Sequence, residues 1–303
     1  MKKFLSMILI ALMMFTCTAC AEEYVVKASA PSGAPALALA MLAVENPENY
    51  TFVAAETISA EFANGNSDFI IAPLNAGAKL YKMGKSTYKL AGVVSWGNLF
   101  IASQKEGFTL NDLNGANVTL FGENTINASV VKYALEKNGI VPASIEYLAS
   151  AAQTQSLLLT DANAIVVTAE PALTAAKMKN AAITAYAVND LYKAATGYEG
   201  YTQAALFVKA ETIANQPEVV KAYIEAVAAS CETASTDVAA LANAAVTLEI
   251  LPNVKVATNA IPGCSIRFVS ALEAKEQVEV TANIDLTQFG GAVPADDFYY
   301  VAE

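Results

Sequence analysis

The sequence has no histidine, a single arginine and a single tryptophan among its 303 residues. The lack of histidine excludes Ser-His-Asp triads, Cys-His pairs, histidine metal ligands and imidazole proton switches. The chain also carries no G-x-S-x-G turn, no phosphate-binding loop and no spacing typical of a metal site. We therefore expect no catalytic residues, no cofactor and no metal. A reaction that uses only lysine or carboxylate groups is not excluded. The adjacent carboxylates Asp296 and Asp297 are typical of a solvated turn and not of a catalytic pair.

Basic residues are also scarce. The chain has 18 Lys and Arg against 29 Asp and Glu, which gives a net charge of −11 and a pI near 4.6. A nucleic-acid-binding protein needs a basic face to neutralise phosphates, so we expect no nucleic-acid partner. Charged residues make up only 16% and apolar residues 55%, which excludes an acidic disordered chain. The length suits about two domains, each with its own core.

One apolar run stands out, and it follows two lysines at the N-terminus. Lys2 and Lys3 precede the apolar residues 4–15, and small residues then continue to Ala21. This is the order of an export signal, so residues 1–21 are predicted to be a cleaved signal peptide, with a buried N-terminal helix as the alternative. The run is shorter than the roughly 20 residues that a spanning helix needs.

The cleavage region allows two outcomes. Ala19-Cys20-Ala21 fits the A-x-A pattern and predicts cleavage after Ala21. Thr18-Ala19-Cys20 is also similar to the end of a bacterial lipobox, which would place a lipid on Cys20, although Cys17 stands where lipoboxes favour leucine. A lipid on Cys20 would tether the domain to a membrane, whereas simple cleavage would release it.

Two cysteines remain beyond this region, Cys231 and Cys264. Outside the cytoplasm a disulfide between them is allowed. Two free, buried thiols are the equal alternative, because the sequence does not give the distance between the two Cα atoms.

Strand-like and helix-like segments alternate along the rest of the chain. Apolar, β-branched runs predict strands, and segments that begin near proline or end at glycine predict helices. The expected strands lie at residues 24–28, 51–55, 68–72, 89–95, 99–103, 117–121, 145–148, 164–167, 183–188 and 203–208. The expected helices lie at residues 35–44, 59–64, 74–83, 127–138, 152–160, 170–178, 217–230, 236–248 and 270–280.

This alternation predicts an α/β fold made of two successive units and a mainly helical return. Each unit is expected to be a mostly parallel sheet flanked by helices. The strands at 99–103 and 203–208 are expected to be paired crossings between the two units.

Four stretches are similar to one family of proteins. They are residues 28–35 (ASAPSGAP), 71–77 (IAPLNAG), 94–98 (VSWGN) and a tail with Gly290-Gly291, Pro294 and residues 297–300 (DFYY). Together they resemble bacterial substrate-binding proteins of ABC importers. The resemblance is to the nitrate, taurine and alkanesulfonate type, which includes binders of thiamine-pyrimidine precursors. Eukaryotic thiamine-pyrimidine synthases resemble this family too, but their chemistry depends on a histidine and clustered cysteines.

The resemblance implies a two-lobe, type II periplasmic-binding-protein fold. One lobe would comprise residues 22–100 and 204–303, and the second lobe residues 101–203. A small-molecule ligand would lie in the cleft, and the lobes would close on it by a hinge motion. The ABC permease and ATPase subunits would be separate chains. The binding protein itself is expected to be an exported monomer, periplasmic or at the cell surface.

Candidate ligand-binding residues lie where strands give way to helices, since ligands of α/β proteins bind beyond the carboxyl ends of strands. In the first unit these residues are Ser32 and Gly33, and then Asn75 and Ala76. Gly33 lets the backbone come close to a ligand, and Asn75 offers both a donor and an acceptor. The alternatives are an ordinary strand-to-helix turn at Gly33 and a helix cap at Asn75.

The other candidates lie at the crossing and in the second unit: Trp96, Asn124, Thr125, Asn127 and Glu170. Trp96, beside Gly97, would stack on a flat ligand, or else belong to the core. The segment from Asn124 to Asn127 would present polar groups to a ligand or cap a helix. Glu170 would accept a hydrogen bond from a ligand, or simply suit the dipole at the start of its helix.

No arginine stands at these junctions, although arginine often clamps a sulfonate or carboxylate. The one arginine, Arg267, is expected in the late helical part. Trp, Tyr, Asn and Glu favour a flat, nitrogen-containing, neutral or cationic ligand, such as a thiamine precursor. Sulfonate- and nitrate-type anions stay possible ligands, because helix N-termini can bind anions without an arginine. The sequence thus predicts an extracytoplasmic solute-binding subunit of an ABC importer, with an exported surface sensor or interaction module as the alternative.

Overall fold

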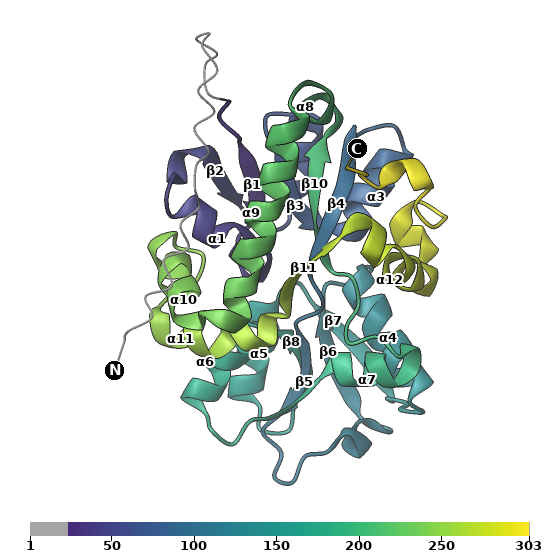
Figure 1. Cartoon of the computed structure of the whole chain (residues 1–303). Coiled ribbons are helices and arrows are strands. Elements are labelled where there is room, and N and C mark those ends of the chain that lie inside the picture. The colour runs from purple at the N-terminus through teal and green to yellow at the C-terminus, as the bar shows by residue number, and fades with distance from the viewer. Residues whose placement is uncertain (1–23, 303) are drawn as a thin grey trace.

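The computed structural model describes residues 24–302, which form two β-sheets with helices packed against them (Figure 1). The predicted signal peptide at residues 1–21 and the predicted lipid site Cys20 lie outside the described residues, so both stay predictions. Within residues 24–302, none of the helices is both long enough and apolar enough to cross a bilayer.

The first sheet has the strand order β11-β4-β10-β3-β1-β2. β1 pairs in parallel with β2 and β3, whereas β10 runs antiparallel to both β3 and β4, and β11 runs antiparallel to β4. The strands are β1 Ala28–Pro31, β2 Tyr50–Val53, β3 Phe69–Pro73, β4 Tyr88–Ser95, β10 Ala204–Lys209 and β11 Ile266–Ser270. The first four strands therefore run in one direction, and the two strands of the returning chain oppose them.

Helices cover both faces of this sheet, as the side chains of β3 show. Phe69 and Ile71 belong to a core with α1, α9, α10 and α11, whereas Ile70 and Ala72 belong to a core with α2, α3 and α12. The helices are α1 Leu37–Ala43, α2 Glu61–Asn64, α3 Leu74–Lys82, α8 Ala210–Asn215, α9 Pro217–Thr236, α10 Val238–Thr247, α11 Val254–Ala260 and α12 Ala271–Ile284. A strand buried on both faces is a continuous apolar run, which made this strand easy to predict.

The second sheet has the order β7-β6-β8-β5-β9. β6 pairs in parallel with β7 and β8, and β5 runs antiparallel to β8 and β9. Its strands are β5 Leu99–Ser103, β6 Asn117–Phe121, β7 Ser144–Leu148, β8 Ile165–Ala169 and β9 Thr184–Ala187. Its helices are α4 Ile126–Lys137, α5 Ala151–Thr160, α6 Ala172–Lys179 and α7 Val188–Thr196.

Short 3-10 helices occupy several connections and the tail. They are η1 Ala34–Ala36, η2 Pro47–Asn49, η3 Ile58–Ala60, η4 Leu110–Leu113, η5 Ile261–Cys264, η6 Leu286–Phe289 and η7 Asp296–Phe298. Two of these helical turns, η6 and η7, lie in the C-terminal tail. Phe289 and Phe298, one in each turn, are buried in the core.

The first strand lies later than predicted. The β-branched run at residues 24–28 predicted a strand, but Tyr24 and Val25 are exposed and the strand is Ala28–Pro31. All four residues of β1 are buried. β1 lies between β2 and β3 and pairs with both of them. This pairing determines which residues form the strand, and it outweighs the β-propensity of residues 24–27.

Apart from the short 3-10 helices, four elements were not predicted: α7, α8, α11 and β11. The first three are short helices, and a short helix depends on tertiary packing more than on its own propensity. β11 follows Ser265, whose φ of 51° turns the chain into the edge of the first sheet. Arg267 therefore lies on a strand and not in the helical part, which corrects the expectation for it.

The chain crosses between the two sheets through two short segments. Residues 96–98 connect β4 to β5, and residues 197–203 connect α7 to β10. The backbone N–H of Gln203 donates to the Ser95 carbonyl at 3.0 Å, so the crossings meet at their first-sheet ends. The predicted crossing strands do not pair with each other, because β5 and β10 belong to different sheets.

The two cysteines within the described residues are both free. The sequence left a disulfide and two free, buried thiols as equal alternatives, and the structure has the free thiols. Cys231 and Cys264 are buried, and the Cys264 thiol donates to the Ala260 carbonyl at 3.3 Å. Burial raises the pKa of Cys231 to about 12 and raises the pKa of Cys264 as well, so both sulfurs are protonated at neutral pH.

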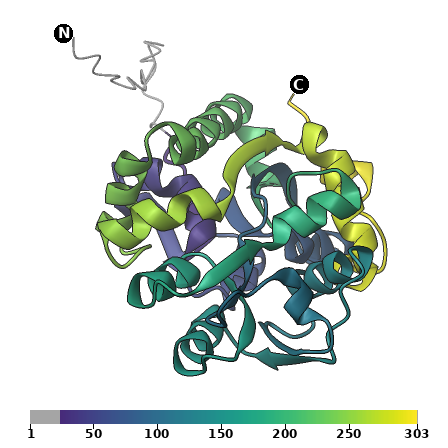
Figure 2. The ribbon, with the colours of Figure 1, turned by 90° about the horizontal axis from the view of Figure 1, so that it is seen from below.

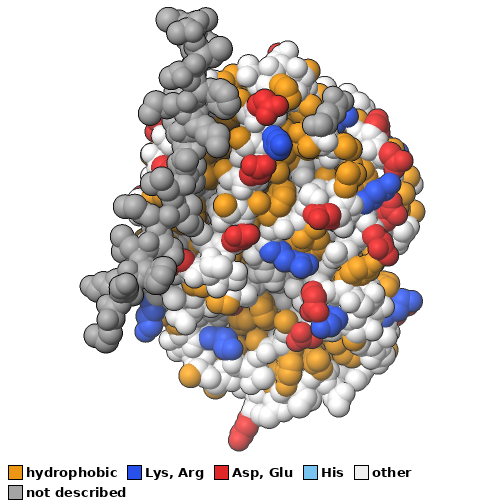
Figure 3. Space-filling model, in the orientation of Figure 1, with side chains coloured by type: hydrophobic (Ala, Val, Ile, Leu, Met, Phe, Trp, Pro, Cys, Tyr) orange, Lys and Arg blue, Asp and Glu red, His pale blue; other side chains and the backbone are white. Residues whose placement is uncertain are grey.

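The two halves also touch through helices on both sides of the crossings. α12 contacts α4, and α11 contacts α6. In the view from below, the yellow C-terminal part lies along the edge beside the teal part of the chain (Figure 2). On the face drawn in Figure 3, acidic and basic side chains are interspersed, with no continuous basic area.

Candidate functional site

A groove of about 290 Å³ lies where strand ends of the first sheet face the start of α4. From the first-sheet side it is lined by the ends of β1 and β3, the start of β10 and the first turn of α3. From the second-sheet side it is lined by the start of α4. The lining residues are Pro31, Ser32, Pro35, Ala55, Pro73, Asn75, Ala76, Thr125, Ile126, Asn127, Gln203, Ala204 and Gln288.

Two helices begin at this groove. The N–H groups of a helix's first turn have no partners within the helix. At α3, the N–H of Leu74 donates to the Gln203 carbonyl at 3.0 Å. At α4, the Thr125 hydroxyl accepts from Ala128 N–H at 3.3 Å and donates to the Gly122 carbonyl at 2.7 Å. The remaining first-turn N–H groups give the groove a partial positive charge from both sides.

The floor of the groove is a network built on Gln203. Its Oε1 accepts from the Ser95 hydroxyl at 3.0 Å, and its Nε2 donates to Asn98 Oδ1 at 3.0 Å. Asn127 Oδ1 accepts from the Tyr201 hydroxyl at 2.9 Å and from Gln203 Nε2 at 3.5 Å. Asn127 therefore has its acceptor occupied, while its Nδ2 has no hydrogen-bond partner among residues 24–302.

Asn75, in the first turn of α3, differs from Asn127. Its Oδ1 is buried and has no hydrogen-bond partner in the described part of the chain. At the rim, Gln288 Nε2 donates to the Asn124 carbonyl at 2.9 Å. Asn75 lines the groove, but its Oδ1 atom itself has almost no accessible surface in the structure.

None of the described residues that line the groove is ionisable. Its polar side chains are carboxamides and hydroxyls, although the chain as a whole has a net charge of −11. The groove can therefore form directional hydrogen bonds to a ligand, but it supplies neither a side-chain cation nor a carboxylate.

The structure brings most of the predicted site residues together. The groove is lined by five of them: Ser32, Asn75, Ala76, Thr125 and Asn127. Gly33 follows Ser32 with φ of 104° and ψ of −155°, a conformation that only glycine adopts readily. Asn124 lies at the rim through its bond with Gln288. Whether these residues contact a ligand stays a prediction.

Trp96 does not line the groove. Its side chain is 2% exposed, and its Nε1 donates to the Arg267 carbonyl at 3.0 Å. The Arg267 guanidinium lies 4.3 Å from the centre of the indole ring, a cation–π contact. In this structure Trp96 connects the first crossing to β11. It is a buried core residue, which was the alternative to stacking on a ligand.

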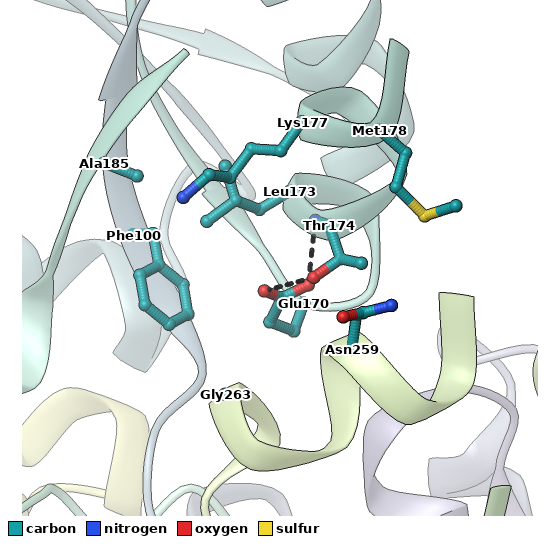
Figure 4. A pocket seen from close by; sticks show the side chains of 9 residues that line it. All are labelled: Phe100, Glu170, Leu173, Thr174, Lys177, Met178, Ala185, Asn259 and Gly263. Carbon is teal, nitrogen blue, oxygen red and sulfur yellow. Dashed lines mark hydrogen bonds between the residues drawn. The ribbon is translucent and has the colours of Figure 1, made fainter. Parts of the chain in front are cut away.

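Glu170 lines a separate cavity of about 420 Å³, between α6 and the η5 turn (Figure 4). Its carboxylate accepts from Thr174 N–H at 3.0 Å and from the Thr174 hydroxyl at 2.8 Å. The Lys177 side chain extends toward the same space. Burial raises the pKa of Glu170, and the hydrogen bonds from Thr174 oppose this shift. In this structure Glu170 lies two residues before α6, and its carboxylate accepts a hydrogen bond from an N–H group of that helix's first turn.

Two polar residues of the groove were missed from the sequence, Gln203 and Gln288. Gln203 opens the apolar strand β10, and a polar residue directly before a buried strand was a usable signal for it. Gln288 lies in the tail, and no local pattern of the sequence indicated its place. Among the described residues, no group of three or more Cys, Asp or Glu could hold a metal ion.

Comparisons with solved structures agree on the fold. An ABC transporter protein from Parabacteroides distasonis is 22% identical, with a TM-score of 0.80 over 93% of this chain and 100% of the other. The periplasmic aliphatic sulphonate binding protein SsuA from Escherichia coli is 13% identical, with a TM-score of 0.70 over 92% of each chain. The alkanesulfonate-binding protein SsuA from Xanthomonas axonopodis pv. citri, bound to MOPS, is 14% identical, with a TM-score of 0.64 over 91% of this chain and 99% of the other.

These neighbours confirm the predicted α/β, periplasmic-binding-protein fold. No curated protein sequence matches the chain. The family described as NMT1/THI5 like matches residues 60–237, which is more than half of the chain. The match spans both crossings and both sides of the groove, and it confirms the resemblance inferred from the sequence. The chain therefore belongs to the NMT1/THI5-like family and has the fold of the solute-binding subunits of ABC importers.

Proposed function

We propose that this chain captures a small molecule in the groove between its two sheets and delivers it to an ABC permease. The observation that carries the proposal is the groove itself. Both halves of the chain line it, and two helices, α3 and α4, begin at it. The mechanism is differential affinity: the ligand stabilises the closed arrangement, and the permease recognises that arrangement.

The proposed lobes are residues 22–100 with 204–303, and residues 101–203. In support of this division, the first sheet takes strands from residues 28–95 and 204–270, and the second takes strands from residues 99–187. The short crossings at residues 96–98 and 197–203 are the proposed hinge. Gly97 lies in the first crossing with φ of 87°, a backbone conformation that glycine adopts readily.

The proposed partners are the permease and ATPase, as separate chains, and the binding protein acts as a monomer without turnover. Similar structures carry names of this kind: an ABC transporter protein, and a ligand-binding component of an ABC-type import system from Staphylococcus aureus. We place the chain outside the cytoplasm, periplasmic or at the cell surface. The signal pattern at residues 1–21 supports export, and the lipobox-like ending supports a lipid anchor on Cys20.

The ligand classes proposed from the sequence are a flat nitrogen-containing compound, such as a thiamine precursor, and a sulfonate- or nitrate-type anion. Two of the solved neighbours are named as sulfonate-binding proteins. The preference for a flat or cationic ligand depended in part on Trp96 and Glu170, which lie outside the groove lining, whereas Asn75 and Asn127 line the groove.

A thermal-shift screen of the purified chain tests the proposal. The panel holds thiamine precursors, riboflavin, nitrate, taurine, alkanesulfonates, polyamines and amino acids. A ligand at about 100 times its dissociation constant adds about 2.7 kcal/mol to the free energy of unfolding, which raises the melting temperature measurably. The rise should vanish in Asn127→Leu and persist in Asn215→Leu, an exposed asparagine at the end of α8. A rise that survives Asn127→Leu unchanged would place binding outside the groove.

A further inference from the structure

We infer that Asp285 and Gln288 form a latch that fastens the two proposed lobes together beside the groove, so that the chain favours the closed arrangement before a ligand binds. Both residues belong to the first lobe, and both are hydrogen-bonded to the beginning of α4 in the second lobe. The inference rests on the proposed function, because it concerns how the same groove opens and closes.

Asp285, the residue between α12 and η6, makes the stronger contact of the latch. Its Oδ1 accepts from the N–H and the hydroxyl of Thr287, which fixes the carboxylate within the first lobe. Its Oδ2 accepts from the Ser129 hydroxyl of α4 at 2.7 Å, whereas the Thr125 carbonyl lies 3.3 Å from that hydroxyl.

The Asp285 carboxyl is ionised when it makes this contact. Burial alone would raise the pKa of Asp285, but the hydrogen bonds from Thr287 and Ser129 outweigh burial and hold the pKa below its ordinary value. A hydrogen bond to an ionised carboxylate is stronger than a bond between neutral groups. The Ser129 contact is therefore worth more than an ordinary bond between two polar side chains.

Gln288 makes the second contact, three residues farther along the chain. Its Nε2 donates to the Asn124 carbonyl at 2.9 Å. Asn124 has φ of 58° and directly precedes Thr125, the N-cap of α4. The latch thus holds both the turn before α4 and the first turn of α4, which is the part of this helix that lines the groove. Asp285 and Gln288 are in this sense positioning residues for one wall of the groove.

α12 connects the latch to the second crossing. Thr281, one helical turn before Asp285, accepts from the N–H of Thr202 at 3.2 Å, within the crossing at residues 197–203. α12 also packs against α4 (Figure 1). A rotation about the crossings that widens the groove therefore moves η6 away from α4 and breaks the bonds of Asp285 and Gln288.

The opposite side of the interface has no such fastening. There α11 and η5 of the first lobe face α6 of the second lobe, and a cavity of about 420 Å³ lies between them. Within residues 24–302, no hydrogen bond joins α6 to α11 or to η5, and Glu170 accepts from Thr174 of its own lobe. Direct polar contacts therefore hold the lobes together beside α4, and a cavity separates them beside α6.

Amide hydrogen exchange of the purified chain, without added ligand, measures the latch. An amide that is exposed only in the open arrangement exchanges in proportion to the population of that arrangement. The reporting peptides are residues 32–36 of the first lobe and residues 125–128 of the second, which line the groove from opposite sides. Peptides from β3 and β6, inside the two lobes, report on unfolding instead.

The double variant Ser129→Ala with Gln288→Ala removes both bonds across the interface. It leaves Asp285 bonded to Thr287, and it keeps α4, because alanine is a better helix former than serine. We expect the protection of both groove peptides to fall about tenfold or more, while the protection of β3 and β6 stays as in the parent. Ser129→Thr alone keeps the hydroxyl and should keep the protection of the parent.

The matched control is Ser156→Ala with Gln277→Ala. These residues lie on α5 and α12, and their side chains make no hydrogen bond among the described residues. The control should therefore exchange like the parent at both groove peptides.

Residues 32–36 decide the outcome, because neither substitution of the double variant lies in that segment. A tenfold fall there, absent from the control and from Ser129→Thr, supports the latch. Unchanged protection at residues 32–36 overturns it. An equal loss in β3 and β6 also overturns it, since the bonds would then support the fold and not closure.

The thermal-shift screen of the parent tests the proposed function separately. A parent that responds to a ligand of the panel, with groove peptides that ignore the double variant, loses the latch and keeps the proposed function. A screen without any response counts against the proposed function, whatever the exchange of the groove peptides.

Discussion

The two cavities between the halves of the chain differ in charge and in how their polar groups are occupied. The groove at α3 and α4 holds only uncharged polar groups, and the Asn75 oxygen in it has no partner within the described chain. The cavity at α6 holds the carboxylate of Glu170, but Thr174 already donates two hydrogen bonds to it. The ionisable side chain of Glu170 thus has its hydrogen bonds satisfied within the protein, whereas the groove is lined by uncharged polar side chains from both halves of the chain. In the sequence, an ionisable residue at the start of a helix was therefore a weaker indicator of the groove than the uncharged polar residues were.

The largest expected effect is in the floor of the groove. Gln203→Leu orphans the buried Ser95 hydroxyl and the Asn98 amide oxygen, so we expect a loss of about 3 kcal/mol in the free energy of unfolding. Ligand affinity in the groove should fall as well, because Asn127 loses one of its two supports. Urea unfolding and titration measure the two effects. Gln277→Leu is the control, since the side chain of Gln277 makes no hydrogen bond among the described residues. Unchanged stability would mean that the network does not support the groove.

The next effect is backbone strain at the groove's edge. Gly33 has φ of 104° and ψ of −155°, and a Cβ added to it meets nothing within 4 Å. Gly33→Ala should therefore destabilise the chain by about 2 kcal/mol through strain alone, without a clash. Gly77→Ala is the contrasting variant, because its Cβ would lie 2.3 Å from the Phe207 ring and the cost there is steric. Thermal unfolding measures both, and a fully stable Gly33→Ala would show that the turn relaxes freely.

A smaller effect tests the second cavity. Glu170→Gln should leave affinity in the groove unchanged, because Glu170 does not line it. Burial raises the pKa of Glu170 above that of an unfolded glutamate, so the native chain holds the proton more tightly than the unfolded chain. The parent should therefore gain stability relative to the glutamine variant as the pH falls from about 7 to about 5.

Melting temperatures of the parent and Glu170→Gln across this pH range measure the difference. A parent that loses stability relative to the variant on acidification would contradict the raised pKa. A large loss of ligand affinity in Glu170→Gln would erase the distinction between the two cavities and bring Glu170 into the binding site.

The smallest expected effect is none at all. Cys264 lies next to Gly263, which lines the cavity of Glu170, and Cys264 and Cys231 are free and buried. A reductant such as dithiothreitol should therefore leave the melting temperature unchanged. A fall of several degrees on reduction would indicate a disulfide and a different arrangement of this side of the molecule.

The sequence predicted those features that local physics controls. The strands at residues 68–72 and 117–121 were found because continuous or alternating apolar runs favour buried strands. Asn75, Thr125 and Asn127 were found because helix starts after strands gather at one edge of a parallel sheet. β1, β11 and the short helices were missed or misplaced, because their positions depend on pairing and packing with distant segments.

The sequence by itself determined the absence of histidine chemistry, the α/β alternation and the family. Only the tertiary structure decided which polar residues face the groove. In the folded chain Trp96 stacks on Arg267, and Glu170 accepts a hydrogen bond from Thr174. Gln203 and Gln288 line the same groove as Asn75 and Asn127. The physical reason is that hydrogen bonds between residues far apart in sequence determine which polar atoms remain unpaired, and unpaired atoms determine what a groove can bind.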